Sequence, residues 1–113
     1  MARSSPPPRL RRLPVVTVLG REVRVATPFR ARLLGLAQLD LDQAGPGLLI
    51  PGCSSVHTFG MRFALDLYFL DERDSPLSVR RGIPACRIAS CRGSSAVLEI
   101  PATEGGEFLP LRP

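Results

Sequence analysis

The feature that most constrains this chain is an apolar run, residues 61–70, with a single acid inside it. Every second residue from Phe63 to Phe69 is apolar, and most of the residues between them are apolar as well. Successive side chains of a strand point to opposite faces, so a strand with two apolar faces lies inside a sheet that is covered on both sides. Residues 61–70 are therefore predicted to form the central strand of a sheet.

Asp66 is the acid in this run and is flanked by Leu65 and Leu67. Burying an ionised carboxylate without a partner costs roughly several kcal/mol. We expect Asp66 to accept hydrogen bonds from an arginine or backbone N–H groups, either of a neighbouring strand or of the loop at 51–61. Two roles stay open: a structural residue that fixes this loop, and a binding or acid–base residue.

The rest of the chain predicts short strands and many turns, since 113 residues include twelve prolines and ten glycines. Thr27-Pro28 is typical of a helix start, and Gly35 is suited to end that helix. We expect an α+β fold, predominantly antiparallel β, as a compact barrel-like or curved sheet with one short helix near residues 28–35. The other expected strands cover residues 14–19, 22–26, 47–50, 76–80, 87–92 and 95–100.

The positive charge of the chain is concentrated at its beginning. Residues 1–12 contain four arginines and no acid, whereas residues 13–113 contain eleven arginines and ten acids. We predict a disordered Arg/Pro-rich tail over residues 1–12 and a single compact β-rich domain over residues 13–113. Nucleic-acid binding is not expected apart from this tail, because the chain has no tryptophan and a single tyrosine on which bases could stack.

The three cysteines are too few for a disulfide scaffold. No stretch approaches the roughly 18–20 apolar residues of a membrane span, and the first residues do not match a secretory signal. These observations predict a cytoplasmic protein with reduced thiols and no membrane association.

A polar loop, residues 51–62, leads into the apolar run and overlaps its first two residues. This loop holds the only histidine of the chain. Small, hydroxyl and basic side chains there suit a polar or anionic small molecule or a protein partner, bound without catalysis. No cofactor is expected. The candidate binding residues are Cys53, Ser54, Ser55, His57, Thr58, Arg62 and Asp66.

The residues of this loop also allow two other chemistries, hydrolysis and zinc binding. A hydrolase could use His57 as base with Cys53 or Ser55 as nucleophile and Asp66 as the orienting acid, although no nucleophile-elbow pattern accompanies them. Zinc could be held by the three thiols and the imidazole, but no zinc-knuckle glycines accompany them, and no metal site is predicted. The ligand residues in that alternative would be Cys53, His57, Cys86 and Cys91.

Four segments, taken in order, resemble the domain of unknown function 192 family of small prokaryotic proteins: residues 30–36, 47–50, 57–70 and 96–101. The resemblance covers about residues 14–103. Ala37 and Ala64 stand where that family usually has methionine and proline, and the family's usual closing Gly-Asp would begin about where this chain stops. The resemblance implies a compact β-rich α+β fold and implies no particular reaction.

Overall fold

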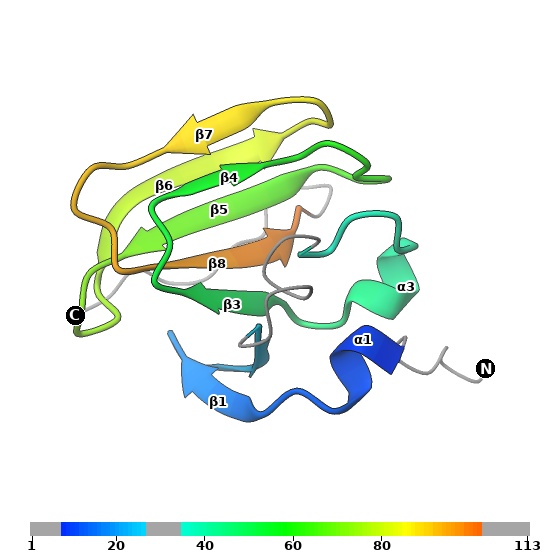
Figure 1. Ribbon diagram of the computed structural model, residues 1–113, viewed down its shortest axis with the longest axis horizontal. Helices are drawn as coiled ribbons and strands as arrows, with labels where there is room; N and C mark the ends of the chain where they lie inside the picture. The colour runs from blue at the N-terminus through cyan, green and yellow to red at the C-terminus, as the bar shows by residue number, and fades with distance from the viewer. Residues whose placement is uncertain (1–7, 27–34, 103–113) are drawn as a thin grey trace.

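The computed structural model describes residues 8–26 and 35–102. It consists of a six-stranded sheet and a two-stranded ribbon (Figure 1). The elements in chain order are α1 (Pro8–Arg11), β1 (Val15–Val18), β2 (Arg21–Val25), α3 (Leu41–Ala44), β3 (Leu48–Pro51), β4 (Ser55–His57), β5 (Leu65–Leu70), β6 (Pro76–Ile83), β7 (Ile88–Ser90) and β8 (Ala96–Pro101).

The strand order in the large sheet is β1-β2-β3-β8-β5-β6, and β4 and β7 form the ribbon. All pairings in both sheets are antiparallel except β2 with β3. The expected β-rich, mostly antiparallel fold is confirmed. The barrel-like alternative is wrong for the part of the chain that the structure describes, because β1 and β6 lie at opposite margins and do not pair.

The central strand was predicted correctly in its position but not in its length. β5 begins at Leu65 and lies between β8 and β6, and its six residues are all buried. Leu65, Leu67 and Phe69 belong to the core cluster between sheet and ribbon, whereas Tyr68 and Leu70 belong to the cluster on the other face. Residues 61–64 instead form an irregular segment, bent at residues 62–63, that leads into the strand.

Several expectations need correction. The structure places Pro8–Arg11 in a helical turn and buries Leu10 and Leu13 in the core, which differs from the predicted tail over residues 8–12. The arginines and prolines around Leu10 are typical of an exposed segment, so the sequence does not predict that Leu10 is buried. Residues 1–7 lie outside the described part of the chain, and so does the helix predicted near residues 28–35, apart from Gly35.

The strands predicted over residues 14–19 and 22–26 place the first hairpin turn at residues 20–21, but the structure turns one residue earlier, at Leu19-Gly20. Val18 pairs with Arg21, and both turn residues have positive φ, 52° and 75°. Positive φ at both central residues is the geometry of a type I′ turn, whose twist matches that of the flanking strands. The pairing of the two strands therefore holds Leu19 in a conformation that its side chain disfavours.

Candidate functional site

The loop predicted over residues 51–62 contains a strand, β4, which pairs with β7. Val56 of β4 and Ala89 of β7 point into the core, so their neighbours in each strand point outward. We call the outward surface the ribbon face. It consists of Ser55, His57, Ile88 and Ser90 from the two strands and Phe59 from the turn that follows β4.

Two large apolar side chains protrude from the ribbon face. Phe59 is 49% exposed and Ile88 is 69% exposed. His57 lies directly opposite Ile88, and its ring stacks on Phe59 with 5.3 Å between ring centroids. The backbone N–H of Phe59 donates to His57 Nδ1 at 3.2 Å, which holds the imidazole against the phenyl ring.

Thr58 fixes the turn that presents Phe59. Its side chain is buried, and its hydroxyl donates to the Pro84 carbonyl at 2.7 Å and accepts from the Arg87 N–H at 2.8 Å. The Thr58 carbonyl accepts from the N–H groups of Met61 and Cys86. Thr58 is thus the centre of a hydrogen-bond network that joins residues 58–61 to residues 84–87.

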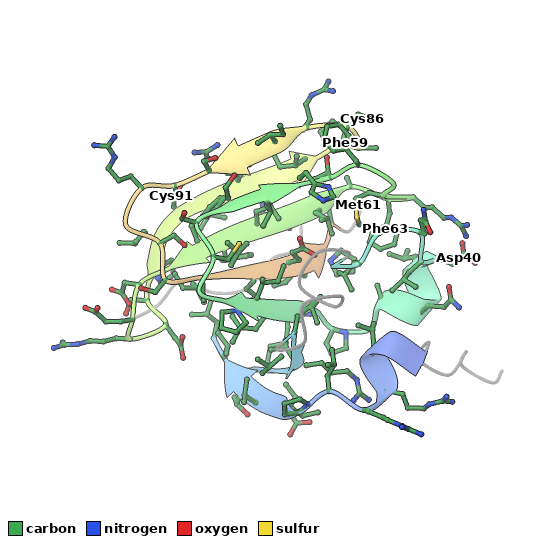
Figure 2. All side chains as sticks on the ribbon, in the orientation of Figure 1. Asp40, Phe59, Met61, Phe63, Cys86 and Cys91 are labelled. Atoms are coloured by element: carbon green, nitrogen blue, oxygen red, sulfur yellow. The ribbon has the colours of Figure 1, made fainter. Side chains whose placement is uncertain are left out.

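A second set of contacts joins the same turn to residues 37–40. The N–H of Gln38 donates to the Gly60 carbonyl at 2.7 Å, and Arg62 pairs with Asp40 at 2.9 Å. Gln38 and Cys86, which flank the turn, both have positive φ without being glycine. Backbone strain of this kind persists only where the surrounding structure imposes it. The turn is therefore held from both sides. Phe59 and Cys86 lie at one corner of the molecule (Figure 2).

The structure separates the seven predicted site residues. Ser55 and His57 lie on the ribbon face, and Ser54 is exposed beside it. Thr58 and Cys53 face inward, so they support the site but do not line it. The remaining two are Arg62 and Asp66. Arg62 is exposed but paired with Asp40, and Asp66 lies in β5, away from the ribbon face.

Asp66 lies on the face of the sheet opposite to the ribbon. Its Oδ1 accepts from the Gly82 N–H at 2.8 Å, and its Oδ2 is 3.6 Å from the Arg81 guanidinium. Both partners belong to a bulge in β6, where Arg81 and Gly82 together stand opposite Asp66. The expected partners from a neighbouring strand are confirmed. The expectation that Asp66 fixes the 51–61 loop is wrong, because alternation along β5 directs its side chain away from that loop.

The groups required for hydrolysis or zinc binding do not converge. The Cys53 thiol donates to the Ser55 carbonyl, the Ser55 hydroxyl accepts from Ser90, and His57 Nδ1 accepts from the backbone. None of these hydrogen bonds joins His57 to either nucleophile. Within residues 8–26 and 35–102, no three histidine, cysteine or acidic side chains are grouped so that they could hold a metal ion.

Glu99 is a buried acid that the sequence analysis missed. It lies in β8 opposite Leu48 and Leu67, and all six residues of the strand are buried. Burial raises the pKa of Glu99 to about 7, and a hydrogen bond from the Leu36 backbone opposes part of that rise. Its Oε1 has no hydrogen-bond partner among the described residues and lies so close to Gly35 that a Cβ there would be 2.7 Å away.

Comparison with known proteins identifies the family to which this chain belongs. The DUF192 family, described as an uncharacterized ACR, matches residues 15–107, and this chain belongs to it. Among curated proteins, none matches. No helix within the described residues is long and apolar enough to cross a membrane.

Two solved structures share the fold. One is a protein from Sinorhizobium meliloti 1021 proposed to be a transcription regulator, with 22% identity and a TM-score of 0.59 over 78% of this chain and 77% of that one. The other is a protein of unknown function from Novosphingobium aromaticivorans DSM 12444, with 17% identity and a TM-score of 0.57 over 78% and 71% of the two chains. At these identities the likeness establishes the fold alone.

Proposed function

We propose that this protein is a non-catalytic binding module and that its ribbon face recognises an acidic segment of a protein partner. The observation that carries the proposal is the exposure of Phe59 on a turn that Thr58 holds rigid. Large aromatic side chains dominate the energetics of many protein interfaces. A side chain whose position is already fixed in the free protein loses little conformational entropy when the partner binds.

The shape of the surface favours a protein segment over a small molecule. Small-molecule sites usually enclose most of their ligand in a concave pocket. Phe59 and Ile88 instead protrude from the ribbon, with the polar pair Ser55 and Ser90 beside them. Protruding apolar side chains with polar neighbours suit a partner that brings its own hollow or flat apolar surface.

The charge of the surrounding segments favours an acidic partner. Residues 52–65 and 75–93, which form the ribbon, the loops beside it and β6, contain five arginines and no acid. Arg62 and Arg81 are paired with Asp40 and Asp66, but neither Arg87 nor Arg92 forms an ion pair among the described residues. Arg87 directly precedes Ile88 in the chain and is exposed, and its guanidinium donates to the Cys86 carbonyl at 3.4 Å, so it carries a positive charge without an acidic partner among the described residues. Complementary charge would raise the association rate of an acidic segment.

The alternative, a hydrolase that uses His57 with Cys53 or Ser55, has less support. The Cys53 thiol donates to a carbonyl and His57 Nδ1 accepts from a backbone N–H, and these bonds would have to be released before that nitrogen could take a proton from the thiol. The Ser55 hydroxyl is bonded to Ser90 and not to His57. A cytoplasmic location is part of the proposal, since Cys53, Cys86 and Cys91 are free thiols and need a reducing compartment to stay so.

The test is selection of phage-displayed random peptides on the intact protein, followed by affinity measurement on the enriched sequences. The expected peptides carry net negative charge and at least one large apolar residue. Phe59→Ala should weaken their binding about tenfold or more, as truncation of a central aromatic does. Arg87→Ala should weaken binding less, and its effect should shrink at high salt.

Two matched variants provide the control. Leu77 of β6 is 48% exposed, close to the value for Phe59, and Arg73 is an exposed arginine in the β5–β6 turn. Leu77→Ala and Arg73→Ala should bind the peptides as the wild type does. If no peptide is enriched, or if Leu77→Ala weakens binding as much as Phe59→Ala, the proposal is wrong.

A further inference from the structure

The two margins of the six-stranded sheet differ in how they are protected against pairing with another strand. β6, at one margin, contains Pro76, the adjacent arginines Arg80 and Arg81, and the bulge at Gly82. Proline, charge and bulges are the usual means by which proteins block a free sheet edge. β1, at the other margin, has the sequence Val-Val-Thr-Val and contains none of these features.

The backbone of β1 has hydrogen-bonding groups directed outward. The N–H of Val25 donates to the Pro14 carbonyl at 2.8 Å, and the register pairs Val16 with Val23. Because hydrogen-bonded and non-hydrogen-bonded pairs alternate in an antiparallel ladder, Pro14, Val16 and Val18 direct their polar groups toward β2. Val15 and Thr17 therefore direct their N–H and C=O groups away from the sheet, where no described strand pairs with them.

This margin is also apolar. Val15 is 52% exposed and Val16 is 39% exposed, although both belong to a strand of the main sheet. Figure 1 shows β1 at the edge of the molecule farthest from β7. A partner on β1 would therefore leave the ribbon face accessible, and the two surfaces could be occupied together.

We infer that β1 pairs with β1 of a second copy of this chain, antiparallel and about a two-fold axis through Val16. In this register Val15 of one copy exchanges both backbone hydrogen bonds with Thr17 of the other. Val16 then stands opposite Val16 of the second copy in a non-hydrogen-bonded pair, where side chains approach most closely. The two sheets continue into one another.

The absence of charge in β1 argues for a second copy as the occupant. A strand with a charged residue near its centre would meet the same charge in an antiparallel pairing with itself, and like charges opposite one another are destabilising. The sequence of β1, Val-Val-Thr-Val, contains no charged residue and so avoids this repulsion. Two four-residue strands form a small interface, so the dimer is weak and depends on concentration.

The test is sedimentation velocity on the full chain over about two decades of concentration. The wild type should pass from monomer to dimer, and Val16→Lys should raise the dimer dissociation constant about tenfold or more, since it places two ammonium groups across the axis. Leu77→Lys, an equivalent change at the β6 margin, should leave the constant unchanged. Circular dichroism shows whether each variant is folded.

Val16→Cys gives a second, independent measurement. A non-hydrogen-bonded pair brings the two Cβ atoms to about 4.5–5.5 Å, near disulfide range. Under mild oxidation this variant should form a covalent dimer much faster than the wild type or Leu77→Cys. A protein that stays monomeric at every concentration overturns the inference. So does a dimer that Val16→Lys leaves intact and that Val16→Cys does not cross-link.

Discussion

Replacing Glu99 by glutamine should stabilise the protein at and above neutral pH and leave it nearly unchanged in mild acid. The pKa of Glu99 rises from an ordinary 4.5 to about 7 on folding, because its carboxyl is fully buried. A rise of about 2.5 pH units corresponds to about 3 kcal/mol, at roughly 1.4 kcal/mol per unit.

The sign follows from proton binding. Between the two pKa values the folded protein holds a proton on Glu99 that the unfolded chain has released, so raising the pH favours unfolding. The contribution of Glu99 to stability is complete below 4.5 and is lost as the pH rises through about 7. Glutamine has nearly the same shape and cannot ionise, so Glu99→Gln does not lose this stability as the pH rises.

The assay is urea unfolding of wild type and Glu99→Gln at several values between about pH 5 and about pH 8. The difference in unfolding free energy between the two proteins should change by about 2.5 kcal/mol across this range, in favour of Glu99→Gln, since part of the loss has already occurred at the acid end. Glu72→Gln, a change at an exposed acid, should show almost no such trend. A difference that stays constant with pH would refute the assignment of a buried, proton-binding carboxyl to Glu99.

Two further predictions concern the supports of the site. Thr58→Val should destabilise the protein by about 2 kcal/mol, because it removes the hydroxyl that accepts from the Arg87 N–H, whereas Thr58→Ser should keep most of the stability. Chemical denaturation measures both, and equal effects would contradict the role of the hydroxyl. Gly35→Ala should cost more than Gly93→Ala, since both have positive φ but only the first places a Cβ against Glu99. A melting-temperature comparison tests this, and equal losses would show that the contact with Glu99 is not tight.

The sequence was most informative where a pattern follows from local geometry. Alternation around Asp66 predicted a buried strand and a carboxylate with partners from the next strand, and both are present. The same criterion applies equally to Glu99, an acid inside the apolar strand β8, and would have identified it.

Other features depend on pairing between segments far apart in the chain. Ser55–His57 is too polar to be recognised as a strand until β7 is known to pair with it. Ile88 resembles a core residue in sequence, and only the burial of its neighbour Ala89 shows that it points outward. Likewise, no local pattern predicts that Leu10 enters the core.

The most direct test of the proposed function is a map of amide chemical-shift changes when an enriched acidic peptide is titrated into isotopically labelled protein. We expect the changes to concentrate at residues 55–59 and 86–90 and to vanish for Phe59→Ala. Changes centred on β1, on β6 or around Asp66, or changes that survive in Phe59→Ala, would contradict it.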